Sequence, residues 1–294
     1  MINLYQAVKQ HSGYFKQLQC RGLLFTQYDC PQAERKESFF IECSYIAYVI
    51  SGRRIFHKLG KTWDLCEGVS VFVKKGTHIA EKLGGDGWCV LVFFIPDDYL
   101  AQFFRQNCNS LMSDKNKATI ADHILPLKIS NISQSFFYSM LPYFSQTPPP
   151  HEDLLELKFK ELLFSILSNN QNPSLLAYLN TLANENYYTI QAIMESNFTS
   201  NLSLEQYAQL ACKSVATFKR HFQTVYHDTP ANWIKKRRIQ YAEDLLHSSV
   251  SPIKDIAYEC GFENHTHFNR IFKELKGITP LAFRKSRQTD INKI

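Results

Sequence analysis

Two short clusters of hydrogen-bond donors recur near the C-terminal end of the chain. Their members are Thr217, Lys219, Arg220 and His221 in the first cluster and His265, His267, Asn269 and Arg270 in the second. Arginine can donate two hydrogen bonds to guanine, asparagine can read adenine, and lysine mainly neutralises phosphate. Each of these side chains could contact a DNA base, contact the DNA backbone or face solvent, and the spacing does not distinguish these three alternatives. Together the clusters predict recognition of double-stranded DNA.

The two clusters belong to two copies of one sequence pattern. The first copy contains Leu204, Ala208, Phe218, Arg220, Phe222, Thr229 and Pro230, and the second contains Ile253, Ala257, Phe268, Arg270, Phe272, Thr279 and Pro280. Two phenylalanines four residues apart share the core face of a helix in each copy, which turns the donors away from the core. Ser203 with Gln206 forms a capping box, and Ser214 can cap the next helix. Each copy predicts a helix-turn-helix motif.

A connecting helix is predicted between the two copies, from Pro230 to His247. At about 1.5 Å per residue it would be about 27 Å long. This length can hold two recognition helices near the ~34 Å that separates successive major-groove faces. We therefore expect helices 214–225 and 265–276 to enter consecutive major grooves.

The first half of the chain has a different pattern. Short apolar runs lie between Gly, Asp and Pro, for example Tyr45 to Ile50, Ser70 to Val73 and Cys89 to Ile95. Such runs are typical of strands in a small barrel or sandwich. Three consecutive prolines at 148–150 then mark a joint between segments.

An amphipathic helix is predicted directly after this joint, from Glu152 to Asn169, and a second helix over residues 174–183. Apolar side chains at three- and four-residue spacing form a stripe on the first helix: Leu155, Phe159, Leu162, Leu163 and Ile166. The stripe either packs on its own domain or forms a self-association surface, and periodicity does not distinguish these partners. We assign the five side chains to dimerisation, which predicts a homodimer.

The composition indicates two domains without a membrane span or a redox motif. The chain of 294 residues is 45% hydrophobic, which allows a core in each domain. No stretch approaches the roughly 18 apolar residues of a membrane helix, and the N-terminus lacks a signal peptide's apolar run, so a cytoplasmic protein is expected. The eight cysteines form no C-x-x-C pair. Of the net charge of +6, +5 lies in residues 188–294, which suits a polyanionic partner.

The second copy of the repeat carries a family pattern in Ile253 to Ala257, Gly261-Phe262, Thr266 to Lys273, Gly277 to Pro280 and Phe283-Arg284. With these residues the chain resembles the AraC/XylS family of bacterial transcription regulators over residues 188–287. It departs from the family at Phe283, where Tyr is common, and at Cys212 and His227, where Gly is common. We expect His227 to strain its turn, because Gly tolerates positive φ more readily.

The resemblance implies an α+β protein in three segments. These are a cupin-like β-barrel regulatory domain in residues 1–147, dimerisation or linker helices in 148–187, and an all-α domain of two helix-turn-helix motifs in 188–294. Gly52, Gly68 and the stretch Val71 to His78 resemble the strand-turn pattern of such barrels. Only His78 and Glu81 resemble the ligands of a metal-binding cupin, and no His-x-His cluster is present. Neither a metal nor a cofactor is expected.

Seven side chains of the predicted barrel are candidates for an effector site: Tyr45, Tyr48, Phe56, Trp63, Phe72, His78 and Phe93. An aromatic-rich barrel is either filled by its own side chains, as in a protein-regulated domain, or holds a small molecule. The family resemblance implies sugars for some members and fatty acids or partner proteins for virulence-type activators. The Gly52 to Arg54 and Lys74-Lys75 turns lack the polar cluster of a sugar site, which favours the second group.

These features predict a sequence-specific transcription regulator. We expect an activator that binds promoter half-sites as a homodimer, contacts RNA polymerase and responds to an effector of unknown identity. An enzyme built on the barrel is a second class, but no nucleophile, metal or acid-base constellation is visible for it. An architectural DNA-binding protein with low sequence specificity is the third class.

Overall fold

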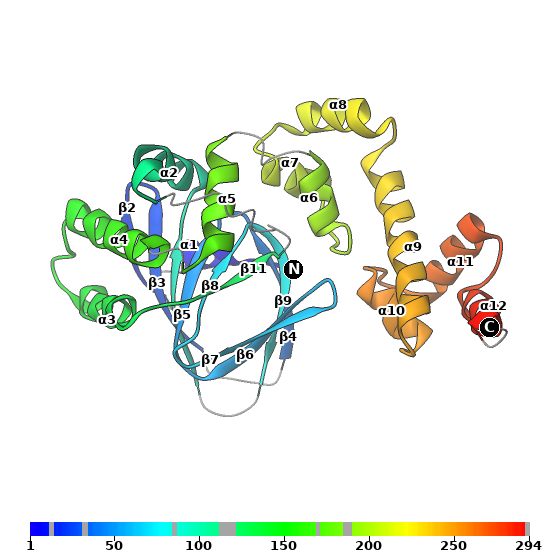
Figure 1. The fold of residues 1–294 in the computed structure, drawn as a ribbon, viewed down its shortest axis with the longest axis horizontal. Coiled ribbons are helices and arrows are strands. Elements are labelled where there is room, and N and C mark those ends of the chain that lie inside the picture. Colours follow the sequence, from blue (N-terminus) through cyan, green and yellow to red (C-terminus); the bar gives the residue numbers. More distant parts are fainter. Residues whose placement is uncertain are drawn as a thin grey trace. The chain divides into compact units, whose positions relative to one another are not determined.

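The computed structural model describes residues 1–11, 15–30, 35–83, 87–111, 122–168, 171–184 and 190–291. The chain divides into two compact units, Met1–Tyr187 and Tyr188–Ile294. Strands occur in the first unit, whereas the described part of the second is helical (Figure 1). The prediction of an α+β protein is confirmed.

Two β-sheets form the framework of the first unit (Figure 1). The five-stranded sheet has the order β1 (Ile2–Asn3), β4 (Arg35–Ile41), β9 (Gly76–Lys82), β6 (Arg53–Lys58) and β7 (Lys61–Cys66). The six-stranded sheet has the order β11 (Ile124–Leu127), β8 (Ser70–Val73), β5 (Tyr45–Ser51), β10 (Trp88–Phe94), β3 (Leu23–Cys30) and β2 (Lys16–Cys20). Neighbouring strands are antiparallel except β1 and β4, which are parallel. Apolar side chains of both sheets share one core.

Helices cover the other face of the six-stranded sheet. They are α2 (Asp97–Leu111), α3 (Asn131–Met140), α4 (Glu152–Leu167) and α5 (Pro173–Ala183), while α1 (Leu4–Gln10) and the short η1 (Leu141–Ser145) complete the unit. Because successive strand residues point to opposite faces, β5 directs Ala47 into the core between the sheets and Tyr48 toward the helices. The Tyr48 ring stacks on Phe137 of α3 at 4.3 Å. Strand β5 therefore buries apolar side chains on both of its faces.

The apolar stripe of α4 lies in this second layer, which corrects one prediction. Leu155, Phe159, Leu162, Leu163 and Ile166 are each at most 2% exposed. Phe159 packs against Phe25 of β3, with 5.6 Å between ring centroids. Their assignment to a subunit interface is wrong, because the hydrophobic effect has already removed them from solvent within one subunit.

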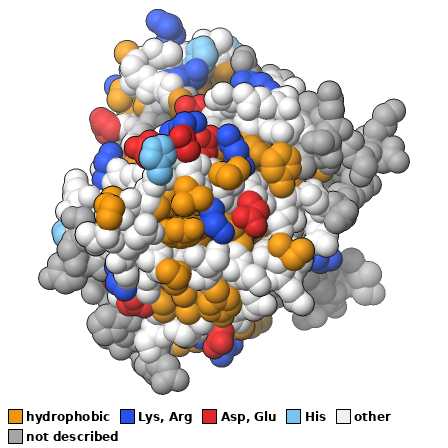
Figure 2. Space-filling view, turned by 90° about the vertical axis from the view of Figure 1, so that its left-hand side faces the viewer, with side chains coloured by type: hydrophobic (Ala, Val, Ile, Leu, Met, Phe, Trp, Pro, Cys, Tyr) orange, Lys and Arg blue, Asp and Glu red, His pale blue; other side chains and the backbone are white. Residues whose placement is uncertain are grey.

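Other apolar side chains of the same helices do reach the surface. Leu157 of α4 is 66% exposed and Ile132 of α3 is 70% exposed. Leu154 and Tyr138 are also exposed. The space-filling view from the side of α3 and α4 shows hydrophobic side chains gathered on this face (Figure 2). An apolar surface is thus present, but on the outer side of the helices.

The second unit consists of seven helices in its described residues. They are α6 (Ile190–Asn197), α7 (Leu204–Leu210), α8 (Val215–Tyr226), α9 (Pro230–Ser248), α10 (Ile253–Glu259), α11 (His265–Lys276) and α12 (Pro280–Ile291). Ala242 of α9 and Ala257 of α10 are fully buried beside Phe268 and Phe272. Both predicted helix-turn-helix motifs are present, joined by α9. Throughout the described parts of the chain, no helix combines the length and apolar character needed to cross a membrane.

Candidate functional site

The first recognition helix, α8, is positioned by a cap and by two buried rings. The Ser214 side chain accepts a hydrogen bond from the Thr217 backbone N–H, which fixes where α8 begins. Phe218 and Phe222 are fully buried. Lys219, Arg220 and His221 are consequently exposed, and Thr217 is half-buried.

The second recognition helix, α11, repeats this arrangement with a different cap. The Asn264 side chain accepts hydrogen bonds from the backbone N–H groups of Thr266 and His267. Phe268 and Phe272 are fully buried. Of the predicted donors, His265, His267 and Arg270 are exposed and Asn269 is half-buried. Both clusters therefore lie on solvent-accessible helix surfaces.

The predicted donors do not all lie on one stripe of their helix. At about 100° per residue, Arg220 lies almost opposite Phe218, with Thr217 beside it. His221 is displaced by about a further 100° toward the core side. Its counterpart in the second copy, 50 residues later, is Ile271, which is only 4% exposed. The structure thus brings Thr217 and Arg220 together and moves His221 to the flank.

Sequence reasoning missed residues on the same stripes. Ala216 and Gln223 are exposed on α8, as are Thr266 and Lys273 on α11. At about 100° per residue, each points to nearly the opposite side of its helix from the first buried phenylalanine. Counting helical phase from Phe218 and Phe268 would have found them.

Arg270 has a partner within its own helix. Its Nη1 atom lies 3.6 Å from Oε2 of Glu274, one turn later, and both side chains are at least half exposed. Glu274 also lies 3.8 Å from Nζ of Lys235 in α9. The Glu274 carboxylate therefore competes with any other acceptor for the guanidinium of Arg270 on the second recognition helix.

Left-handed residues form the turns of both motifs. Cys212 and Gly261 occupy equivalent positions with φ of 52° and 87°, and His227 and Gly277 do so with φ of 50° and 79°. The expectation that His227 occupies a position with positive φ is confirmed. Two non-glycine residues thus adopt a conformation that glycine tolerates better.

One guanidinium ties α9 to the segments on both sides of it. Arg238 donates through Nε to the carbonyl of Phe198 at 2.7 Å and through Nη1 to that of Gly261 at 2.7 Å. Its Nη2 donates to the Ser200 carbonyl and the Asn201 side chain, each at 3.0 Å. The chain before the first motif and the turn of the second motif therefore share one anchor.

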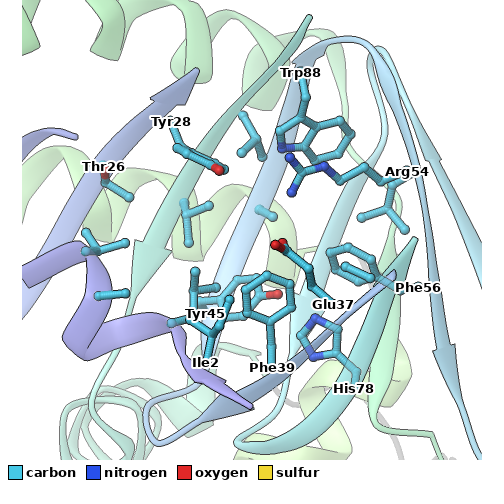
Figure 3. A pocket seen from close by; sticks show the side chains of 18 of the residues that line it. Ile2, Thr26, Tyr28, Glu37, Phe39, Tyr45, Arg54, Phe56, His78 and Trp88 are labelled. Carbon is cyan, nitrogen blue, oxygen red and sulfur yellow. The ribbon is translucent and has the colours of Figure 1, made fainter. Parts of the chain in front are cut away.

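A cavity of about 230 Å³ lies between the two sheets of the first unit (Figure 3). Of the seven side chains predicted for an effector site, Tyr45, Phe56 and His78 line it. Tyr48, Phe72 and Phe93 do not, because they point to the helix-covered face, where Phe72 packs on Tyr178 and Phe93 on Phe137. Trp63 packs against the core between the sheets without lining the cavity. These four assignments are corrected.

Few polar groups reach this cavity. Lys82 and Glu37 form an ion pair of 3.0 Å, and Arg54 lies 4.7 Å above the Trp88 ring. Burial, followed by the charge of Lys58, lowers the pKa of His78 to about 3, so that His78 is neutral near pH 7. His78 and Glu81, the two residues that resemble the ligands of a metal-binding cupin, do not share a site: Oε2 of Glu81 lies 2.7 Å from Nε2 of His57 instead. No group of three His, Cys, Asp or Glu side chains suited to a metal ion occurs among the described residues.

Comparison with known proteins identifies both units. Residues 44–178 match the ExsA N-terminal regulatory domain, and residues 207–286 match a helix-turn-helix domain. The thermoregulatory protein LcrF of Yersinia pestis is 28% identical over 240 residues, covering 81% of this chain and 88% of LcrF. The transcriptional activator RhaS of Mannheimia succiniciproducens is 30% identical over 245 residues, covering 80% of this chain and 83% of RhaS. ToxT of Vibrio cholerae is a similar solved structure, with a TM-score of 0.40 and 16% identity over 89% of this chain and 97% of ToxT.

Two exposed recognition helices in one helical unit define a DNA-binding protein of the double helix-turn-helix class. The identity to RhaS over most of both chains shows the family as well. The chain belongs to the AraC/XylS family of transcription regulators. It is therefore a DNA-binding transcription regulator and not an enzyme, and these comparisons give no support to the architectural alternative.

Proposed function

We propose that this regulator activates transcription by placing α8 and α11 in successive major grooves of promoter DNA. The observation that carries the proposal is the equivalent placement of Arg220 and Arg270, which are both exposed and lie opposite the buried phenylalanines of their helices. The names of LcrF and RhaS, a thermoregulatory protein and a transcriptional activator, support a positive regulatory role.

The donors take different roles in this arrangement. Arg220 and Arg270 read bases through paired hydrogen bonds, since a guanidinium matches guanine. Lys219 neutralises a DNA phosphate. His265 and Thr266, in the first turn of α11, contact another phosphate of the DNA backbone, because the N-terminus of a helix favours anions. Thr217, His267 and Asn269 lie beside the arginines and contact neighbouring bases. His221, on the flank of α8, contacts a phosphate.

We further propose that the protein acts as a homodimer in the cytoplasm, where it meets RNA polymerase at promoters. The apolar outer side of α3 and α4, with Ile132, Tyr138, Leu154 and Leu157, is the surface available for a second subunit. Leu157→Glu should convert dimers to monomers in sedimentation velocity experiments, because it places a charge in the apolar contact. An unchanged dimer in this variant would rule out this surface.

Chromatin immunoprecipitation with sequencing tests the proposed function. The tagged wild type should give sharp peaks upstream of a few promoters, sharing two half-sites about ten base pairs apart. Arg220→Ala and Arg270→Ala should lose these peaks. Gln240→Ala, an exposed change on α9, should keep them. Broad coverage that is insensitive to both arginine variants would identify an architectural protein instead.

Binding of the purified variants to the recovered DNA then separates the two kinds of contact. Arg270→Ala should weaken binding by about 1 to 3 kcal/mol and relax the preference at one base position. A loss that is equal on all sequences would show that Arg270 contacts phosphate rather than a base.

A further inference from the structure

The two helix-turn-helix motifs differ at one position of their recognition helices. Thr217 of α8 and His267 of α11 are equivalent, since each precedes the first buried phenylalanine of its helix. Thr217 is half-buried, whereas His267 is exposed. Each lies three residues before the arginine of its motif, and therefore about 60° from it around the helix and about 4.5 Å along it. One step of the DNA duplex is about 3.4 Å, so the two side chains of each motif reach base pairs one or two steps apart.

The ring of His267 is positioned by the turn that precedes α11. Phe262 lies in this turn and contacts the imidazole edge to face, with 5.8 Å between ring centroids. Phe262 is only 5% exposed, because it packs on Phe268 at 5.2 Å and lies 5.8 Å from the guanidinium of Arg238. Within the described residues, the His267 ring makes no hydrogen bond to the protein, and the Asn264 cap engages only its backbone N–H. A held imidazole with unused nitrogen atoms therefore lies on the exposed side of α11.

The first motif lacks both parts of this arrangement. Lys213 occupies the place of Phe262, since the backbone N–H of each donates to the carbonyl of the buried alanine in the preceding helix, at 2.9 and 3.0 Å. The Thr217 hydroxyl oxygen accepts a hydrogen bond of 2.9 Å from the Ser214 hydroxyl, which engages it within the helix cap. The two recognition helices thus present different chemical groups at equivalent positions.

An imidazole and a threonine make different contacts in the major groove. Whether neutral or charged, an imidazole carries at least one N–H donor. Guanine presents two adjacent acceptors there, N7 and O6, whereas adenine places an amino donor beside its N7 acceptor. An N–H donor therefore prefers guanine. A threonine whose hydroxyl oxygen is already engaged offers mainly its methyl group, which suits the methyl group of thymine.

We propose that His267 reads a guanine in the second half-site and that the first half-site needs no guanine at the equivalent base pair. His267 is thus a specificity-determining residue, and Phe262 is a positioning residue that acts through it. This inference rests on the proposed function, because it requires α8 and α11 to enter the major groove. The two half-sites then differ in sequence although their arginines are equivalent, which fixes the orientation of the protein on the DNA.

Selection from a library of random DNA duplexes with the full-length chain tests the inference. The wild type should select a guanine one or two base pairs from the position at which Arg270→Ala loses its preference. His267→Thr, which installs the residue of the first motif, should lose this guanine and keep the rest of the site. His265→Gln is the matched control, because His265 is also exposed in the first turn of α11 but is assigned to a phosphate. It should weaken binding to all sequences and keep the guanine.

A change in the DNA then tests the contact itself. Replacing the selected guanine by 7-deazaguanine removes the N7 acceptor and retains base pairing. In fluorescence anisotropy this change should weaken wild-type binding about fivefold or more and leave binding by His267→Thr unaffected. A wild type that selects another base at this position, an unchanged affinity for the 7-deazaguanine duplex, or a guanine preference that survives in His267→Thr would overturn the inference while the proposed function stands. A wild type that selects no sequence would overturn both.

The positioning role of Phe262 is testable in the first motif, where the core around Phe262 stays intact. Thr217→His alone should add little preference for guanine in the first half-site, because Lys213 does not hold the new ring. Thr217→His combined with Lys213→Phe should add a preference of about threefold or more over the other bases. Equal preferences in the single and the double variant would overturn the role of Phe262.

Discussion

Gly261 packs directly against the backbone of Thr199, so closely that a Cβ atom at Gly261 would lie 2.1 Å from the Thr199 carbonyl oxygen. Gly261 also has a φ of 87° and accepts the 2.7 Å hydrogen bond from Arg238. The turn of the second helix-turn-helix motif is therefore fixed by close backbone contact and by a guanidinium at the same point. This contact joins α10 and α11 to the segment that precedes α7.

Gly261→Ala should destabilise the helical unit by about 3 kcal/mol or more, because the added methyl group meets backbone atoms that cannot move independently. Gly277→Ala is the matched control. Gly277 also has positive φ, at 79°, but a Cβ atom there meets nothing within 4 Å, and only the backbone strain of about 1 kcal/mol is expected. Urea unfolding followed by the helical circular dichroism signal measures both. Equal losses would mean that the Thr199 contact contributes nothing.

Arg238→Lys should destabilise the same unit by about 2 to 4 kcal/mol although it retains the charge. An ammonium cannot reproduce the hydrogen bonds that the guanidinium makes with Phe198, Ser200 and Gly261, and partly buried carbonyl groups then lose their donors. DNA affinity should fall as well, since the two motifs lose their common anchor. The exposed Gln240→Ala change on α9 is the control in both measurements. A variant as stable as the control would contradict the anchoring role.

The helical unit could be predicted from its sequence in detail, because duplicated Phe pairs and capping residues specify local geometry. The first unit could be predicted as strands followed by two helices, which the structure shows as α4 and α5, but the buried faces of the strands could not be assigned. Alternation in β5 and β10 distributes aromatic residues over two buried faces, and composition does not reveal which face encloses space. Tyr48 and Phe93 were misassigned to the cavity for this reason. Arg54 was missed because its burial depends on Trp88 and Tyr28, which are distant in the sequence.

The first unit should become less stable as the pH is lowered, and part of this loss should depend on His78. Burial and the charge of Lys58 lower the pKa of His78 to about 3, whereas an unfolded histidine has a pKa near 6.5. Below about pH 6.5 the unfolded chain binds a proton that the folded chain excludes. The unfolding free energy therefore decreases as the pH falls from about 6.5 toward about 3.

His78→Phe should make this decrease shallower, because the new ring retains contact with Phe39 and Phe56 but does not titrate. Urea unfolding between pH 4 and 8, followed by tryptophan fluorescence, measures the difference between variant and wild type. Above pH 7 the difference should be constant, which serves as the internal control. Parallel curves down to pH 4 would show that His78 does not titrate on unfolding in this range.

The Glu274 carboxylate should weaken DNA binding by the wild-type protein. It lies 3.6 Å from Arg270 on the exposed surface of α11 and adds a negative charge that faces phosphates in the proposed complex. Glu274→Gln removes both the competing ion pair and the repulsion. We expect promoter affinity to rise about threefold to tenfold at low salt and the gain to shrink at higher salt, where exposed charges are screened.

Fluorescence anisotropy with promoter DNA at several salt concentrations measures this effect. Glu259→Gln changes the net charge equally but lies on α10, where the carboxylate accepts a hydrogen bond from Tyr241 at 3.1 Å. If Glu274→Gln and Glu259→Gln raise promoter affinity equally, the change in net charge alone explains the effect. The gain in DNA affinity should largely disappear when Glu274→Gln is combined with Arg270→Ala, because the guanidinium that Glu274→Gln frees to bind DNA is then absent. A gain that persists in full without Arg270 would show that Glu274 acts by repelling phosphate alone.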